Sequence, residues 1–227
     1  VVTCISTQTL IRRKPKIEYP DSDGRPMSDN TLQFQWIVTL QGGLDALFRD
    51  DPNVFVAGDL LWYPIEGDST VRAAPDVMVV FGRPKGYRGS YQQWDEDDVA
   101  PQVVFEVLSP HVRLAEVVSK FQFYDRFDVE EYYVFDPHKI ELEGWIRRGN
   151  SLAEIPQADG WTSPRLGVRF DLSSGDLQVF EPNGQPFATY VELAAQRELE
   201  RRRAQEERQR AERLAAQLRA LGVEPNG

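Results

Sequence analysis

Residues 101–110 read PQVVFEVLSP, an apolar run with one carboxylate, Glu106, near its middle. A short apolar run rich in β-branched residues and bounded by prolines predicts a strand buried inside a sheet. A carboxylate in such a strand costs free energy unless a cation or a hydrogen-bond donor compensates it. This stretch therefore predicts both the central sheet and a candidate functional site on it.

Residues 74–82, APDVMVVFG, form a second apolar run, with Asp76 at its beginning. Side chains alternate along a strand, so Asp76 shares a face with Met78, and Glu106 shares one with Leu108. If the two strands are neighbours, the two carboxylates can converge. One shared cation would then explain both acidic residues.

The surrounding pattern predicts an α/β domain built on a mixed sheet. Apolar residues recur every three or four positions in residues 31–48 and 112–127, the spacing of amphipathic helices. Residues 130–137, EEYYVFDP, predict another strand, so strand, helix and strand follow one another as in a crossover between parallel strands. Short strands with glycine turns follow in residues 140–182 and predict antiparallel strands that extend or flank the sheet.

We divide the chain into an N-terminal arm (1–29), an α/β domain (30–187) and a charged helical tail (188–227). The tail is rich in Arg, Glu, Gln and Ala, and its apolar residues follow a broken heptad pattern typical of a weak coiled coil: Leu193, Ala204, Ala211, Leu214, Leu218 and Leu221. The alternative is a solvated single helix without a partner.

Composition limits the protein class. With 227 residues and 41% hydrophobic residues, the chain can build one full-sized core. Cys4 is the single cysteine, which excludes an intrachain disulfide framework, and no apolar run approaches the roughly 18 residues of a membrane span. We therefore expect a soluble, cytoplasmic protein that does not contact membranes. The formal charge of −10 disfavours strong binding to nucleic acid in the absence of metal.

The two carboxylates and the carbonyl of Val107 would make an all-oxygen site that suits Mg²⁺ or Mn²⁺. Such an ion can polarise a phosphodiester and lower the pKa of an attacking water. A lysine on the same face as Glu106 would complete this chemistry, but that position holds Leu108. The nearest substitute is Lys120 on the following helix, at the border of its apolar stripe, where the ammonium group could orient water or stabilise charge on a phosphate.

Structural roles for the same residues are the alternative. Asp76 could cap a turn at the strand entry, and Glu106 could form a purely structural ion pair with Lys120. The loop between the two acidic strands carries Arg83, Lys85 and Arg88, the best candidates for contacts with a DNA backbone. Its alternative is an ordinary solvated turn.

Three stretches together resemble the Uma-two family of bacterial proteins, named as restriction endonucleases, within the PD-(D/E)XK nuclease-like superfamily. They are APDVMVVFG (74–82), PQVVFEVLSP (101–110) and SKFQFYDRF followed by VEEYYVFDP (119–137). The resemblance extends over residues 30–182 and implies a restriction-endonuclease-like core of mixed sheet flanked by helices.

The resemblance also implies chemistry at named positions. It makes Asp76 and Glu106 metal ligands, places the helix-borne Lys120 where the superfamily has a strand lysine, and implies hydrolysis of DNA phosphodiesters. The acidic residue that many superfamily members carry on the first helix is absent here, and Gln35 is its auxiliary candidate. Because superfamily members often work in pairs, a homodimer is expected. The alternative function is a catalytically inactive module of the same fold that binds DNA or a protein partner.

Overall fold

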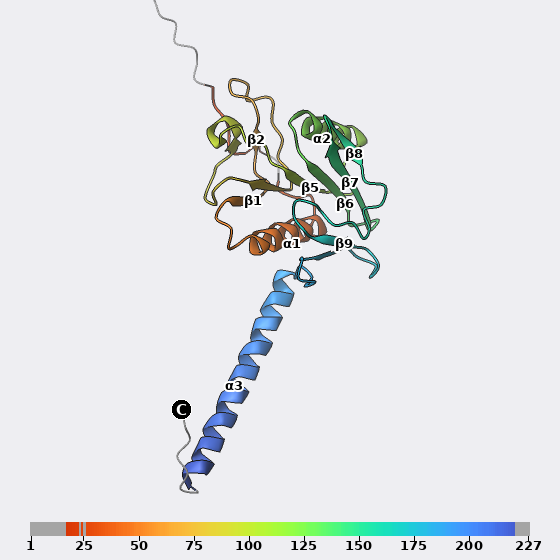
Figure 1. Ribbon diagram of the computed structural model, residues 1–227. Coiled ribbons are helices and arrows are strands. Elements are labelled where there is room, and N and C mark those ends of the chain that lie inside the picture. The colour runs from red at the N-terminus through yellow and green to blue at the C-terminus, as the bar shows by residue number, and fades with distance from the viewer. Residues whose placement is uncertain (1–16, 23, 25, 221–227) are drawn as a thin grey trace, which may run out of the picture.

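A mixed sheet of six strands organises the fold in the computed structural model, which describes residues 17–22, 24 and 26–220 (Figure 1). The strands lie in the order β1 (Val54–Gly58), β3 (Val77–Phe81), β5 (Val103–Val107), β6 (Glu131–Asp136), β7 (Glu141–Arg148) and β8 (Ser151–Glu154). Within this sheet β5 and β6 run parallel, and the other neighbours pair in the antiparallel sense. The predicted α/β fold with a mixed sheet is confirmed.

Helices cover the two faces of this sheet. Helix α1 (Thr31–Leu47) packs on one face over β1, β3 and β5, and helix α2 (Leu114–Arg126) joins β5 to β6 on the other face (Figure 1). Residues on β5 alternate between two apolar clusters, with Val103 and Phe105 on the α1 side and Val104 on the α2 side. This alternation places Glu106 on the face covered by α2.

Helix α1 begins where the sequence supplies a cap. The side chain of Asn30 accepts a hydrogen bond from the backbone N–H of Gln33 at 2.9 Å, which satisfies one of the free donors of the first turn. Near the other end, a Cβ added at Gly43 would lie 2.3 Å from the ring of Phe187. Glycine at this position therefore permits the segment after the last strand to pass close over the helix.

Two small sheets flank the main one. Strand β2 (Trp62–Tyr63) pairs in parallel with β4 (Tyr91–Gln92), which leads into a short 3₁₀ helix, η1 (Gln93–Glu96). Strand β9 (Arg169–Asp171) pairs antiparallel with β10 (Gln178–Phe180). The strands predicted in residues 140–182 therefore divide, because β7 and β8 extend the main sheet while β9 and β10 form a separate pair.

Helix α3 (Tyr190–Ala220) projects away from the rest of the chain and has no buried residue (Figure 1). Its exposed surface carries ion pairs one turn apart, Arg202 with Glu198 and Arg208 with Glu212, of the kind that supports a solvated helix. Leu221 of the predicted seam, like Cys4 and the first half of the predicted arm, lies outside the described residues. Among the helices that the structure describes, none is long and apolar enough to cross a membrane.

Candidate metal centre

Asp76 and Glu106 are brought together by the register of two antiparallel strands. Val77 lies opposite Phe105 in the β3–β5 pair, so the next positions outward set Asp76 opposite Glu106. Opposed residues of this kind have Cβ atoms about 4.5–5.5 Å apart. Both side chains are buried, with 8% of Asp76 and 3% of Glu106 exposed. The structure thus places the two predicted carboxylates side by side.

The carboxylate of Asp76 accepts a hydrogen bond from the backbone N–H of Val107, at 2.6 Å from Oδ2. Burial raises the pKa of Asp76 well above its ordinary value, and the neighbouring charge of Glu106 raises it further, while Lys120 and the Val107 N–H act in the opposite direction. A buried carboxyl group whose ionisation is disfavoured, beside a second buried carboxylate, forms a place where a cation would be stabilised.

Helix α2 supplies two donors to Glu106. The Nζ of Lys120 lies 2.6 Å from Oε2, and the hydroxyl of Tyr124, one helical turn later, donates to Oε1. Burial lowers the pKa of Lys120, but the charges of Glu106 and Asp76 outweigh it, so that the pKa is raised overall. Lys120 therefore carries a proton at neutral pH and acts as a donor rather than as a base.

A glutamine that the sequence reasoning passed over completes this arrangement. The Nε2 of Gln33 donates to the carbonyl of Val107 at 2.9 Å, and its Oε1 accepts the N–H of Asp29 at 2.8 Å. The hydroxyl of Ser109 in turn donates to the carboxylate of Asp29. The predicted auxiliary residue, Gln35, is exposed on α1 and lines no cavity around the carboxylates.

A sequence signal for Gln33 was present. A glutamine three residues after a helix cap such as Asn30 typically folds back toward the backbone before the helix. In this chain that geometry leaves the other end of the amide free to bind the β5 carbonyl.

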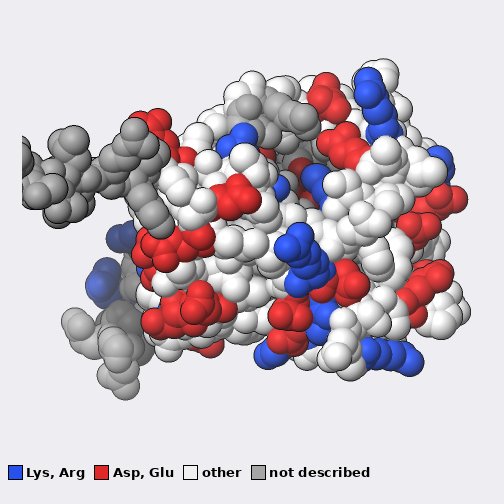
Figure 2. Space-filling view, turned by 90° about the horizontal axis from the view of Figure 1, so that it is seen from above, with Lys and Arg blue, Asp and Glu red and all other residues white. Residues whose placement is uncertain are grey.

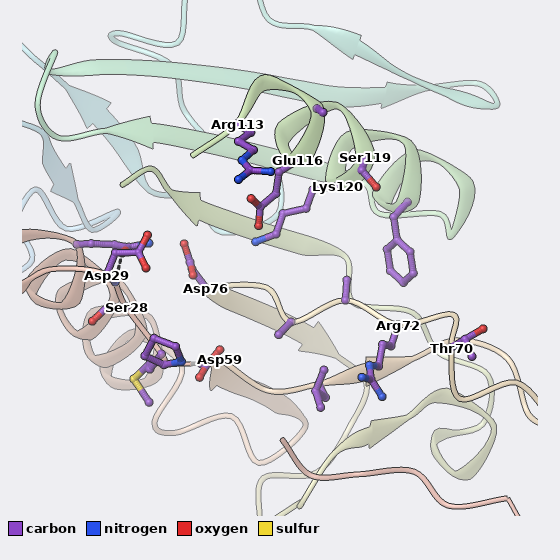
Figure 3. Close-up of a pocket in the computed structure, with 18 residues that line it drawn as sticks. Ser28, Asp29, Asp59, Thr70, Arg72, Asp76, Arg113, Glu116, Ser119 and Lys120 are labelled. Carbon is purple, nitrogen blue, oxygen red and sulfur yellow. Dashed lines mark hydrogen bonds between the residues drawn. The ribbon is translucent and has the colours of Figure 1, made fainter. Parts of the chain in front are cut away.

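Asp76 opens onto two cavities, of about 850 and 110 Å³, whereas Glu106 and Val107 line the smaller of them. Both are lined by Asp29, Gln33, Asp76, Glu116 and Lys120. Figure 3 shows Asp76 and Lys120 pointing toward one another from opposite walls of the larger cavity. The space-filling view shows a hollow on this side of the molecule, with basic and acidic side chains around it (Figure 2).

The available donors fit a hard divalent cation. Two carboxylates and the carbonyl of Val107 supply oxygen, and Mg²⁺ commonly takes only one or two protein carboxylates and completes its shell with water. Within the described residues, no group of three or more His, Cys, Asp or Glu side chains could hold a metal ion. Asp76, Glu106 and Val107 would therefore hold the ion together with water.

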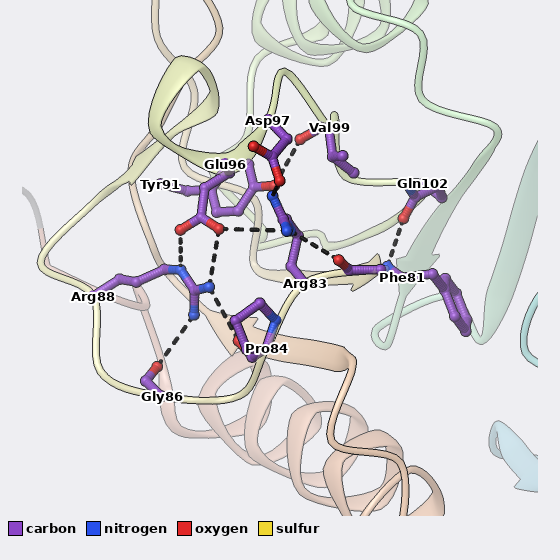
Figure 4. A network of polar contacts seen from close by, with 11 residues as sticks. Phe81, Arg83, Pro84, Gly86, Arg88, Tyr91, Glu96, Asp97, Val99 and Gln102 are labelled. Carbon is purple, nitrogen blue, oxygen red and sulfur yellow. Dashed lines mark hydrogen bonds and ion pairs between the residues drawn. The ribbon is translucent and has the colours of Figure 1, made fainter.

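The basic residues proposed for DNA contacts in the loop after β3 have acidic partners, and Figure 4 shows those of Arg83 and Arg88. Arg88 makes a bidentate contact with Glu96, at 2.5 and 3.1 Å, and stacks over an aromatic ring of β1. Arg83 pairs with Asp97, and Lys85 pairs with Asp45 on α1. Because each of these cations has an acidic partner within the chain, ion pairs hold the loop in place, and it is neither an open basic patch nor a plain solvated turn.

The chain is similar to a described protein family and to a solved structure. The model of the Uma2 family, described as "Putative restriction endonuclease", matches residues 7–179. A crystal structure of a "putative nuclease belonging to DUF820" from Anabaena variabilis is similar over 60% of this chain and 72% of that chain, with 12% identity and a TM-score of 0.44. A search among curated proteins found no match.

Proposed function

The chain belongs to the Uma2 family, and from the family's description as restriction endonucleases we propose that it is a divalent-metal-dependent endonuclease that hydrolyses DNA phosphodiester bonds. The observation that carries this proposal is the position of Asp76 opposite Glu106 across β3 and β5, with the ammonium group of Lys120 2.6 Å from Glu106. Two carboxylates, a carbonyl and a protonated lysine on one cavity wall match the needs of phosphodiester hydrolysis.

In the proposed mechanism, Asp76, Glu106 and the Val107 carbonyl hold Mg²⁺ or Mn²⁺. When bound, the ion supplies Lewis-acid polarisation of the phosphodiester and lowers the pKa of a water. Gln33 orients the Val107 carbonyl through its 2.9 Å hydrogen bond, and the Val107 N–H orients the carboxylate of Asp76. These contacts fix the ligands before the substrate arrives, which limits the reorganisation that the reaction requires.

Lys120 contributes as a cation. A lysine ammonium group is ordinarily charged at neutral pH, so Lys120 can donate to a phosphate oxygen and stabilise the negative charge that develops there. Its side chain is 30% exposed, which leaves the ammonium group accessible from the cavity. The contact with Glu106 holds it at this position from α2, in place of a lysine on β5.

One observation supports the alternative function, an inactive module that binds DNA or a protein partner. Glu106 already has two donors, Lys120 and Tyr124, and a buried ion pair of this kind can be purely structural. In that case the carboxylates would need no cation. The following experiment separates the two proposals.

Purified protein is incubated with supercoiled and single-stranded DNA in the presence of Mg²⁺, Mn²⁺ or a chelator. The endonuclease proposal expects cleavage that requires metal and is lost in Asp76→Ala and Glu106→Ala, but kept in Asp50→Ala, whose side chain is 90% exposed. Folded protein that neither cleaves DNA nor binds metal in calorimetry would instead establish the inactive module.

The proposal includes a cytoplasmic location and a homodimer in which two copies of α3 pair. Exposed Leu214 and Leu218 on the last turns of α3 support this pairing, because pairing with a second helix would remove their apolar side chains from water. Analytical ultracentrifugation of the whole chain tests it: Leu214→Glu should convert a dimer into a monomer. A wild-type protein that sediments as a monomer at all concentrations would exclude the dimer.

A further inference from the structure

We propose that the 850 Å³ cavity beside the carboxylates binds a single strand of nucleic acid, and that Arg72 and Arg113 hold this strand by its phosphates. The inference rests on the proposed nuclease function and names its substrate class. It assigns the two arginines, which come from different segments of the chain, as phosphate-binding residues (Figure 3).

The walls of the cavity come from four segments. They are α2 with the preceding Arg113, the stretch between β2 and β3 that carries Arg72, the stretch after β1 with Asp59, and residues 26–33 of the arm and the start of α1. Asp76 and Lys120 lie among these walls, so a strand lying in the cavity would pass one candidate ligand and the lysine, while Glu106 and Val107 line the smaller cavity that shares Asp76. The cavity is therefore placed to present a phosphodiester to the site.

The charges of the two arginines are not neutralised by carboxylates within the part of the chain that the structure describes. Arg72 makes only long contacts with uncharged oxygens, 3.5 Å to the Tyr63 hydroxyl and 3.4 Å to the carbonyl of Ser69. Arg113 is exposed and forms no ion pair with a described acidic residue. The pairing of Arg88 with Glu96 shows the contrast. The carboxylates of Asp29, Asp59, Asp76 and Glu116 also line the cavity, but among the described residues no ion pair joins a carboxylate to either guanidinium group, so both can contact the phosphates of an anionic ligand.

The size and lining of the cavity favour one strand over a duplex. Its 850 Å³ falls within the range of about 300–1,000 Å³ that is typical of pockets for small ligands, which suits a few nucleotides but not a rigid double helix. Phe123 on α2 contributes an aromatic side chain to the wall, and such rings stack on unpaired bases. The net charge of −10 also disfavours contact with many successive phosphates and is compatible with contact to a few.

The test measures binding of a fluorescently labelled single-stranded oligodeoxynucleotide by anisotropy, in chelator, over a range of salt concentrations. Arg72→Gln and Arg113→Gln should each weaken binding roughly tenfold, the loss of one charge-assisted contact. Each should also reduce the slope of log affinity against log salt by about 0.7, the value for one phosphate of a single strand. Arg72→Lys should keep the slope, and Arg219→Gln at the far end of α3 is the charge-matched control.

The outcomes separate this inference from the proposed function. Unchanged slopes in both glutamine variants, or a duplex that competes as well as the single strand, would overturn the inference even if the protein cleaves DNA with metal. A wild-type protein that binds no oligonucleotide would overturn the inference too, and absence of metal-dependent cleavage in the same preparation would remove the nuclease proposal with it. Circular dichroism of each variant confirms that it is folded.

Discussion

Substitution of Asp76 separates its structural contact from its proposed contact with metal. Asp76→Asn keeps an oxygen that can accept the N–H of Val107, whereas Asp76→Ala leaves that buried N–H without an acceptor. In chelator, we expect the Asn variant to unfold with a free energy within about 1 kcal/mol of the wild type. The Ala variant should lose about 1–3 kcal/mol, the cost of an unsatisfied buried group.

Added Mg²⁺ should make the wild type more stable than the Asn variant. A ligand that binds only the folded state at a hundred times its dissociation constant raises the free energy of unfolding by about 2.7 kcal/mol. The wild type should gain this amount. The Asn variant should gain far less, because a neutral amide replaces one of the two carboxylates that would hold the ion.

Urea unfolding, followed by the fluorescence of the five tryptophans, measures both quantities in chelator and in Mg²⁺. Asp50→Asn, at an exposed position, is the control and should behave as the wild type in both conditions. A gain in Mg²⁺ as large for Asp76→Asn as for the wild type would refute the role of Asp76 as a ligand. An Asn variant as unstable as the Ala variant would refute the reasoning about the Val107 contact.

Three further predictions follow from the same contacts. Gln33→Leu should lower metal affinity in calorimetry about 10- to 100-fold because it releases the carbonyl that faces the ion, while Gln35→Leu should leave it unchanged. Arg88→Met should lower the free energy of unfolding by about 1–3 kcal/mol, because the largely buried Glu96 loses its bidentate partner. The same variant should keep the DNA affinity of the wild type, and a lower affinity would show that the loop binds DNA. In chelator, the folded-state pKa of Asp76 lies above its ordinary 3.8, so the contribution of Asp76 to the free energy of unfolding is complete below pH 3.8 and is lost as the pH rises through the folded-state pKa. The urea midpoint of the wild type relative to that of Asp76→Asn should therefore fall with rising pH. Parallel curves for the two proteins would contradict this.

Much of the fold could be predicted because its signals are local. Apolar alternation and runs marked the strands that became β3, β5 and β6, and the three-and-four spacing marked α1 and α2. The parallel pairing of β5 with β6 followed from the helix between them. The long charged helix at the C-terminal end was equally visible, since a tail rich in Arg, Glu, Gln and Ala has helical propensity but too little apolar surface to bury.

The loop after β3 shows what the local sequence pattern leaves out. Arg83, Lys85 and Arg88 form a basic set when they are read along the chain, and such a set predicts a phosphate contact. Their acidic partners lie from 8 to 40 positions away, at Glu96, Asp97 and Asp45. A run of basic residues is an open basic surface only if the fold leaves the residues without acidic partners. Partners 8 to 40 positions away cannot be recognised from the run itself.

The sequence by itself determined the chemical types at the candidate site: two carboxylates in apolar strands, a lysine at the edge of a helix stripe, and Leu108 where a strand lysine is absent. Tertiary structure alone decided which of these groups meet. The antiparallel register set Asp76 opposite Glu106, the path of α2 delivered Lys120 and Tyr124 to the same carboxylate, and the capped turn of α1 selected Gln33 rather than Gln35. The physical reason is that burial and hydrophobicity act through each residue's own side chain, whereas hydrogen bonds and ion pairs depend on positions to within a few tenths of an ångström, which only the packed elements provide.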